Sequence, residues 1–215
     1  MLRSYYDILI SYLPLLAKGL WATVLISLLS ILIGTLLGTG IYAMTKQRRA
    51  WVRKTAQCYR FIVRGTPIMV LLLLFYYIVL HGRGGIVAAV LAFSFNFSNF
   101  ACSVIQSSFD SVGRGQVDAG ISLGFSRYQI LRYIVVPQAL HNALPTFKFQ
   151  AVTLIKSTSI VGYVSILDLT QVTDAIRNDT GQYFLSLLLI TILYMILAWL
   201  LCKLLDYCVK TTQRI

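Results

Sequence analysis

Long apolar runs separated by short polar segments dominate the chain, and this pattern predicts helices that cross a membrane. A hydrocarbon core of roughly 30 Å is crossed by about 20 mostly apolar residues of helix. Five runs are long enough, at residues 21–44, 61–80, 86–109, 149–167 and 183–205. The expected fold class is therefore all-α, a polytopic membrane protein with five transmembrane helices in a single domain over residues 1–215.

The amino-terminal part of the chain predicts a surface helix followed by a packing helix. Residues 1–18 are amphipathic, and a secretory signal is the alternative because Arg3 precedes an apolar stretch. Asp7 and Pro14 interrupt that stretch, which favours a helix retained on the membrane surface. In the first apolar run, the small residues from Gly34 to Gly40 permit the close approach of another helix.

The segment at residues 115–145 is too polar to cross a membrane and too regular to be a plain loop. A first short helix is expected at Gln116–Leu123, with Val117 and Ile121 on one face. Gly124 can adopt the left-handed conformation that ends a helix. The pattern therefore predicts a helix that turns sharply at a glycine.

A second helix is expected directly after this turn. Ser126 followed by Gln129 is a capping-box pattern, and Pro137 is expected to stop the helix because proline has no N–H to donate. A helix–turn–helix with an apolar ridge between membrane spans can dock into a partner outside the bilayer. It can equally lie on the membrane surface, and the residue pattern leaves both interpretations open.

The third apolar run is the least apolar of the five, because it carries Asn96, Ser98, Asn99, Ser103 and Gln106. Polar groups inside hydrocarbon need protein or water partners. These side chains either form hydrogen bonds between helices or line a wet pathway. On the second interpretation, Asn96 and Asn99 are candidate substrate-pathway residues.

Lys156 lies inside the fourth apolar run, and an intramembrane lysine is a candidate functional residue by default. Ser157, Thr158 and Ser159 follow it as hydroxyl neighbours and join it as candidate pathway residues. A structural ion pair, or a side chain that reaches toward the membrane surface, is the alternative. Lys156 suits a carboxylate, which every amino acid carries, so it does not select a side chain.

The distribution of charged residues predicts how the chain is oriented in the membrane. Only 12% of the residues are charged, against about 25% in soluble domains. The net charge of +12 could indicate a nucleic-acid partner, but in so apolar a chain it indicates membrane orientation, and no nucleic-acid partner is expected. Seven basic residues and no acidic residue lie in Lys46–Arg64. Basic residues collect on the cytoplasmic side of a membrane protein. Fourteen of the nineteen basic residues are inside if the cytoplasm holds this segment, residues 110–148 and the carboxyl terminus. The amino terminus is then outside.

The sequence lacks the motifs of the common catalytic sites. It contains no GxxxxGK[ST] phosphate loop, no HExxH and no GxSxG. Its four cysteines show no metal-binding spacing. We therefore expect no catalytic residue, no metal site and no cofactor bound by this chain, which would not be an enzyme on its own.

Residues 118–145, DAGISLGFSRYQILRYIVVPQALHNALP, resemble the cytoplasmic EAA loop of ABC importer permeases. Asp118, Ala119 and Gly120 fall at the E-A-A positions, and Gly124 falls at the glycine of that motif. The PQALHNALP ending resembles the polar amino acid subfamily, which includes the histidine, glutamine and arginine permeases. Two further stretches resemble the same subfamily: RGTPIMVLL at 64–72 and LIKSTSIVGYVSILDL at 154–169.

The resemblance implies a type I ABC importer fold in the bacterial inner membrane, and a coupling loop that binds a separate ATPase. The implied partners are a dimer of ABC ATPase subunits that holds ATP and Mg²⁺, a second permease subunit, an extracytoplasmic amino-acid-binding protein and the lipid bilayer. The residues expected to couple to the ATPase are Asp118, Ala119, Gly120, Ile121, Leu123, Gly124, Phe125 and Ile130.

Some positions depart from the family pattern. Asp118 stands where Glu is usual, Gly120 where Ala is usual, and Ser103 and Gln106 where an acidic and a basic residue are usual.

An acidic, polar outer loop is expected at Asp168–Gln182, and it would favour cationic substrates or suit the binding protein. The sequence leaves the transported amino acid, and the choice between like and unlike permease pairs, undetermined.

Two other functions compete with that of an ATP-driven importer. A secondary transporter or channel subunit driven by an ion gradient usually shows internal inverted repeats, and we find none here. A purely structural membrane anchor does not explain the polar third run or Lys156. The expected function is therefore that of a permease subunit, with the ion-driven transporter as the alternative.

Overall fold

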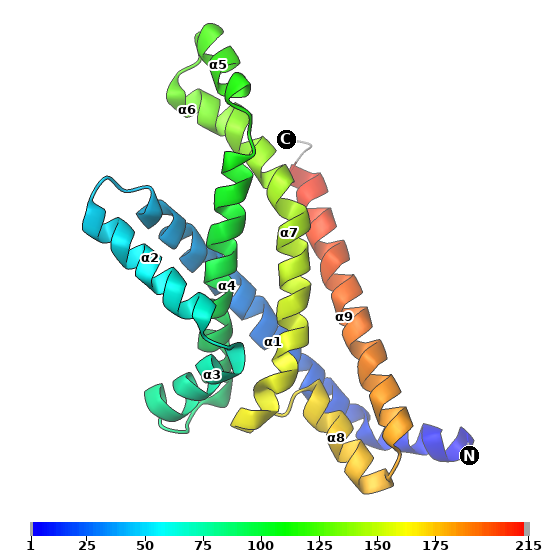
Figure 1. Ribbon diagram of the computed structural model, residues 1–215. Helices are drawn as coiled ribbons and strands as arrows, with labels where there is room; N and C mark the ends of the chain where they lie inside the picture. Colours follow the sequence, from blue (N-terminus) through cyan, green and yellow to red (C-terminus); the bar gives the residue numbers. More distant parts are fainter. Residues whose placement is uncertain (1, 213–215) are drawn as a thin grey trace.

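The computed structural model describes residues 2–212, and the side chains of residues 10–207, as an assembly of helices (Figure 1). No strand occurs in the described residues, so the predicted all-α class is confirmed. In chain order the elements are α1 Leu2–Thr45, α2 Ala50–Gly65, α3 Ile68–Leu73, the π-helix η1 Leu74–Val79, α4 Gly85–Asp110, α5 Arg114–Ser122, α6 Arg127–Gln129, the π-helix η2 Ile130–Val135, α7 Val136–Ser157, the 3-10 helix η3 Thr158–Val164, α8 Leu169–Thr180 and α9 Tyr183–Thr212.

Three helices are long and apolar enough to cross a membrane on their own: α1 over Ile10–Thr45, all of α4, and α9 over Tyr183–Tyr207. Two further pairs of helices pass the same test only together. The segment α2 bends by 105° into α3 and η1, and the stretch Arg127–Val164 bends by 60° into α8. Counting each bent pair as one span gives up to five spans, the number that the apolar runs predict.

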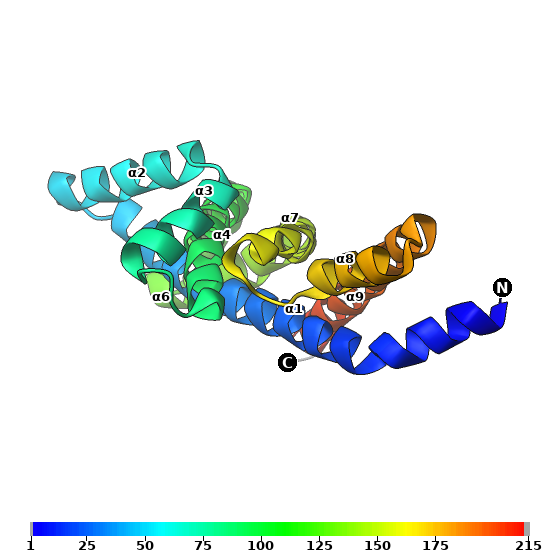
Figure 2. The same cartoon turned by 90° about the horizontal axis from the view of Figure 1, so that it is seen from below.

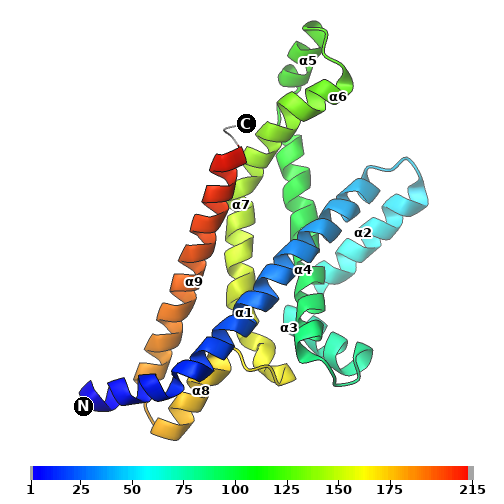
Figure 3. The same ribbon diagram turned by 180° about the vertical axis from the view of Figure 1, so that it is seen from behind.

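The helix α1 crosses the face of α4 and packs closely against it (Figure 3). A Cβ atom added to Gly38 would lie 2.6 Å from both the Ser98 carbonyl oxygen and the Ala101 Cβ. Gly34 lies equally close to α4, whereas a Cβ on Gly40 would meet nothing within 4 Å. The predicted close approach is therefore confirmed at Gly34 and Gly38, and Gly40 takes no part in it.

The amino-terminal segment and the first span are one helix. The predicted surface helix at residues 1–18 joins the first span without a break, and Pro14 lies inside α1. Figure 2 shows that α1 bends toward its amino-terminal end, as a proline inside a helix causes when it removes a backbone hydrogen bond.

The prediction that Pro137 stops the second helix of the loop is wrong. Helical backbone runs on from α6 through η2 into α7, with Pro137 in the first turn of α7. The π-helix η2 lies immediately before this proline, and its wider turn relieves the clash that a proline ring makes with the preceding turn. The second helix of the loop and the fourth expected span are therefore continuous.

The predicted outer loop at Asp168–Gln182 is also wrong, because this segment is largely the helix α8. Asp168 caps it, accepting a hydrogen bond from the Gln171 amide at 3.0 Å. Val172 and Ile176 are buried where α8 packs against α1 and α9. The four-residue spacing of these two side chains, inside a segment rich in polar residues, is the signal of a half-buried helix.

Asp168→Ala is expected to destabilise the protein by about 1 kcal/mol. The fully buried Asp168 side chain caps α8 by accepting a hydrogen bond from the Gln171 amide at 3.0 Å. Alanine leaves that amide without this partner, whereas asparagine caps a helix equally well and should preserve stability.

Thermal unfolding of the purified protein tests this. The Tm of Asp168→Ala should fall below that of the wild type, and the Tm of Asp168→Asn should stay close to it. An alanine variant as stable as the wild type would contradict the prediction.

Candidate functional site

The helix–turn–helix of α5 and α6 projects beyond the other helices at one end of the molecule (Figure 1). Gly124 is in the left-handed conformation at φ 79°, as predicted. Its amide donates to the Ile121 carbonyl at 2.9 Å, and the Phe125 amide donates to the Gly120 carbonyl at 3.0 Å. This pair of bonds is the Schellman motif, which requires a residue with positive φ at the position of Gly124. The turn is therefore fixed by its own backbone.

The predicted capping box at the start of α6 is confirmed. The Gln129 amide donates to the Ser126 hydroxyl at 3.3 Å, and the Ser126 amide donates to the Gln129 side-chain oxygen at 2.8 Å. Together these bonds satisfy two amides that the first turn of a helix leaves without partners.

The tip of this loop exposes apolar side chains. Leu123 is 74% exposed, Ile121 is 59% exposed and Phe125 is 43% exposed. Asp118 and Ala119 are exposed as well. Exposed apolar side chains on a segment too polar to cross a membrane are suited to binding a partner. The positions predicted to couple to a partner are therefore at the surface, with two exceptions.

The exceptions are Gly120 and Ile130, which lie between the two helices. Ile130 is 4% exposed, so its predicted role in gripping a partner is wrong and it holds the loop together instead. A Cβ on Gly120 would lie 2.9 Å from the Ile130 Cγ1 and 3.0 Å from the Ile134 Cδ1. This contact explains why glycine replaces the alanine that is usual in the family pattern.

Several contacts tie the loop to the membrane helices. The Asn142 amide group donates to the Ser111 hydroxyl at 2.9 Å, which joins α7 to the end of α4. Lys46 approaches Asp110 at 3.8 Å, which joins the end of α1 to the same place. Lys148 on α7 forms an ion pair with Asp206 on α9. These contacts hold together the helix ends from which the loop projects, and the loop is an arm on α4 and α7.

A second polar group of residues lies where α2 meets α4. The Arg60 guanidinium on α2 donates to three neutral oxygen acceptors on α4. These are Asn99 Oδ1 at 3.4 Å, Ser103 Oγ at 2.9 Å and Gln106 Oε1 at 3.3 Å. We call these three residues with Arg60 the arginine cradle. Asn99, Ser103 and Gln106 therefore form hydrogen bonds between helices, as one of the two interpretations of the polar third run predicts.

Sequence reasoning missed Arg60, although two signals pointed to it. Asn99, Ser103 and Gln106 recur at helical spacing, so they present one polar face. Arg60 lies ten residues after the start of α2. It is therefore separated from the basic residues that cluster near the start of that helix. Of the remaining residues in the third run, Ser98 bonds with the Tyr59 hydroxyl at 2.7 Å, and Asn96 is half-buried.

The residues around Lys156 do not form a comparable group. The Ser157 hydroxyl donates to the Thr153 carbonyl at 2.9 Å, and the Thr158 hydroxyl donates to the Ile155 carbonyl at 2.7 Å. Thr158 is fully buried and Ser159 is half-buried, whereas the Lys156 side chain is exposed on the surface of α7. No ion pair of the described residues includes Lys156.

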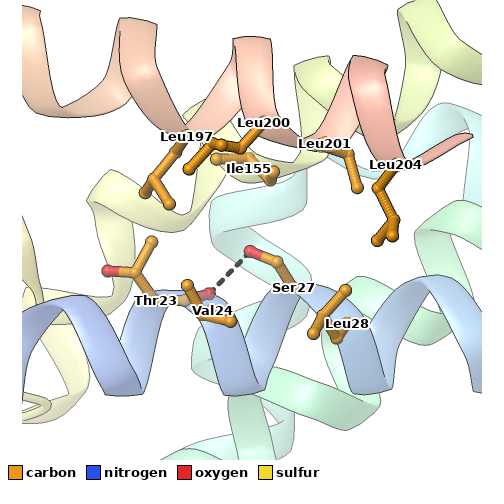
Figure 4. A pocket seen from close by; sticks show the side chains of 9 residues that line it. All are labelled: Thr23, Val24, Ser27, Leu28, Ile155, Leu197, Leu200, Leu201 and Leu204. Atoms are coloured by element: carbon orange, nitrogen blue, oxygen red, sulfur yellow. Dashed lines mark hydrogen bonds between the residues drawn. The ribbon is translucent and has the colours of Figure 1, made fainter.

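A cavity of about 340 Å³ lies between α1, α7 and α9 (Figure 4). Its hydroxyl groups are already engaged, since Ser27 donates to the Thr23 carbonyl at 2.7 Å. The cavity offers no charged group, so it does not suit a polar substrate. Its lining residues are Thr23, Val24, Ser27, Leu28, Ile155, Leu197, Leu200, Leu201 and Leu204.

Comparison with known proteins identifies the family. Residues 30–211 match the model of the binding-protein-dependent transport system inner membrane component family. The chain belongs to this family. Among its relatives is the probable amino-acid ABC transporter permease protein YckA of Bacillus subtilis, which is 31% identical over 88% of this chain and 84% of the relative. Another is the glutamate/aspartate import permease protein GltK of Escherichia coli, which is 28% identical over 93% of this chain and 94% of the relative.

Solved structures agree with this assignment. A chain from a crystal structure of an amino acid ABC transporter with histidines superposes with a TM-score of 0.82, at 30% identity over 94% of this chain and 96% of that chain. An inward-facing structure of the MetNI methionine ABC transporter gives a TM-score of 0.74 at 20% identity, which shows the shared fold. The chain therefore has the fold of an ABC importer permease, and the resemblance of its coupling loop to that family is confirmed.

Proposed function

We infer that the chain is the membrane-spanning permease subunit of an ATP-driven amino acid importer. The observation that carries this function is the projecting arm with an exposed apolar tip, on a chain that belongs to the inner membrane components of binding-protein-dependent transport systems. A permease of this family needs a surface through which an ATPase can move its membrane helices, and the tip at Leu123 and Phe125 is that surface.

The relatives support amino acids as the substrate class. YckA is a probable amino-acid permease, GltK is a glutamate/aspartate permease, and several Rickettsia relatives are putative glutamine permeases. This chain would take a substrate of the same general kind from an extracytoplasmic binding protein.

We further propose how the subunit is assembled. Two ATPase subunits, which hold ATP and Mg²⁺, would bind the coupling loops of two permease subunits, alike or related. The loop and the carboxyl terminus would lie in the cytoplasm and the amino terminus outside, a proposal that the excess of basic residues in these segments supports. The permease itself would hydrolyse nothing and would hold no cofactor.

The arm suggests how ATP drives transport. When the ATPase dimer closes on ATP, the two coupling loops would be drawn together. The arm continues into α4 on one side and α7 on the other, so its displacement would reach both helices directly. Rocking of these helices would then open the pathway to alternate sides of the membrane.

Uptake by the reconstituted complex tests the function. Proteoliposomes that contain the permease, the ATPase and the binding protein should accumulate amino acid only when ATP is supplied, and an ionophore that collapses proton and sodium gradients should have no effect. Uptake that requires a gradient and continues without ATP would overturn the proposal in favour of an ion-driven transporter.

A further inference from the structure

We propose that the arginine cradle binds the carboxylate of an anionic amino acid during transport, so that the permease favours acidic substrates over neutral or cationic ones. The inference rests on the proposed function and adds the charge class of the substrate. It concerns a site on α2 and α4, separate from the coupling loop.

The cradle leaves part of the Arg60 guanidinium free to bind a ligand. A guanidinium carries five N–H groups. Three of them are directed at Asn99, Ser103 and Gln106, through Nε and both terminal nitrogens, which fixes the plane of the group. One N–H on each terminal nitrogen remains, and Arg60 is only half-buried. These N–H groups can donate charge-assisted hydrogen bonds to a carboxylate while the contacts to α4 hold the guanidinium in place.

The cradle also lacks a compensating negative charge. All three acceptors are neutral, and none of the ion pairs among the described residues includes Arg60. The nearest acid along α4 is Asp110, which Lys46 approaches at 3.8 Å. The Arg60 guanidinium, on the helix that leads into the bent pair α2 and α3, therefore has no carboxylate paired with it among the described residues and attracts an anion.

The acidic residues of the segment at 168–182 are already engaged, so they do not argue for a cationic substrate. Asp168 is fully buried and caps α8. Asp174 pairs with Arg177 at 3.0 Å, and the Tyr12 hydroxyl donates to Asp179. The attraction for cations that this segment suggests from its sequence is therefore weakened by its own contacts.

The cradle is thus a cationic group with no carboxylate among its printed contacts. A substrate that carries a side-chain carboxylate is attracted by the Arg60 charge, whereas a cationic side chain is repelled by it. Glutamate and glutamine have nearly the same shape, so a comparison between them isolates this effect.

Equilibrium binding to the purified permease–ATPase complex in nanodiscs, without binding protein, tests the inference. The probes are L-glutamate, L-glutamine and L-arginine. We expect glutamate to bind tighter than glutamine by roughly tenfold or more, which corresponds to one charge-assisted hydrogen-bonded contact, and arginine to bind weakest. Equal binding of the three probes, or binding of none, would overturn the inference.

Two variants separate a carboxylate site from a simple tether between helices. Arg60→Gln should make glutamate and glutamine bind alike. Gln106→Glu should also make glutamate and glutamine bind alike, because the new carboxylate would neutralise the Arg60 charge. It should cause no loss of thermal stability, because glutamate keeps the contact to Arg60. A preference for glutamate that persists in Gln106→Glu, or an Arg60→Gln variant that loses only stability, would show a tether alone and overturn the inference.

Arg53→Gln is the matched control. Arg53 is an exposed arginine on the same helix and lies outside the cradle, so the preference for glutamate should not change. Co-purification of the ATPase and ATP-dependent uptake, measured in every variant, report on the proposed function. If the wild type showed neither ATPase co-purification nor ATP-dependent uptake, the proposed function would be wrong. The ratio of glutamate affinity to glutamine affinity reports on the cradle alone.

Discussion

Replacing Leu123 and Phe125 together by aspartate is expected to release the ATPase from a permease that still folds and inserts. Both side chains are exposed at the tip of the loop, and neither belongs to a buried cluster, so the change leaves internal packing intact. Apolar anchors at the centre of an interface contribute about 2 kcal/mol or more each. Loss of two such anchors, with two charges added, should lower ATPase affinity roughly a thousandfold.

Co-purification of the ATPase with tagged permease from membranes measures this loss. The matched control is the pair Leu123→Met with Phe125→Leu, which keeps an apolar surface and should retain the ATPase. Thermal unfolding of the permease alone should be unchanged in both variants. An ATPase that still co-purifies with the doubly charged variant would disprove the coupling role of the tip.

Gly38→Ala is expected to destabilise the permease, whereas Gly40→Ala is expected to leave it unchanged or slightly more stable. A Cβ on Gly38 would lie 2.6 Å from a backbone carbonyl of α4, which no side-chain rotation can relieve. Such overpacking costs about 1–3 kcal/mol. Around Gly40 there is nothing within 4 Å, so alanine brings only its better helix propensity, worth up to about 1 kcal/mol.

In detergent, the Tm of Gly38→Ala should therefore fall below that of the wild type, whereas the Tm of Gly40→Ala should equal or slightly exceed it. Because the residues are two positions apart on one helix, they share membrane depth and helix propensity and differ in what they face. Equal shifts would show that α1 and α4 are not in the close contact that the structure describes.

The features that the sequence predicted correctly are those that depend on neighbours in the chain. The turn at Gly124 and the capping box at Ser126 follow from backbone conformation and from side chains three residues apart. The long apolar runs likewise follow from the thickness of a bilayer. Local rules suffice for such features because the interacting groups are fixed by the chain itself.

The features that the sequence did not predict depend on residues far apart in the chain. Ile130 looks like surface until α5 folds back over it, and Arg60 looks like one more basic residue until α4 brings three acceptors to it. Pro137 ordinarily ends a helix, and only the wider turn of η2 lets the helix continue. The acidic segment at 168–182 reads as a loop because its polar residues outnumber the few that pack.

Helical backbone continues from Arg127 to Ser157 through the π-helix η2, so no loop separates the coupling arm from α7. In the proposed transport cycle, a rotation of the arm would therefore be carried along α7. The backbone changes at the 3-10 turns of Thr158–Val164 and the left-handed Ser165, after which the chain bends by 60° into α8. The segment beyond Ser165 would then move separately from α7, so that one end of the pathway would close before the other opens.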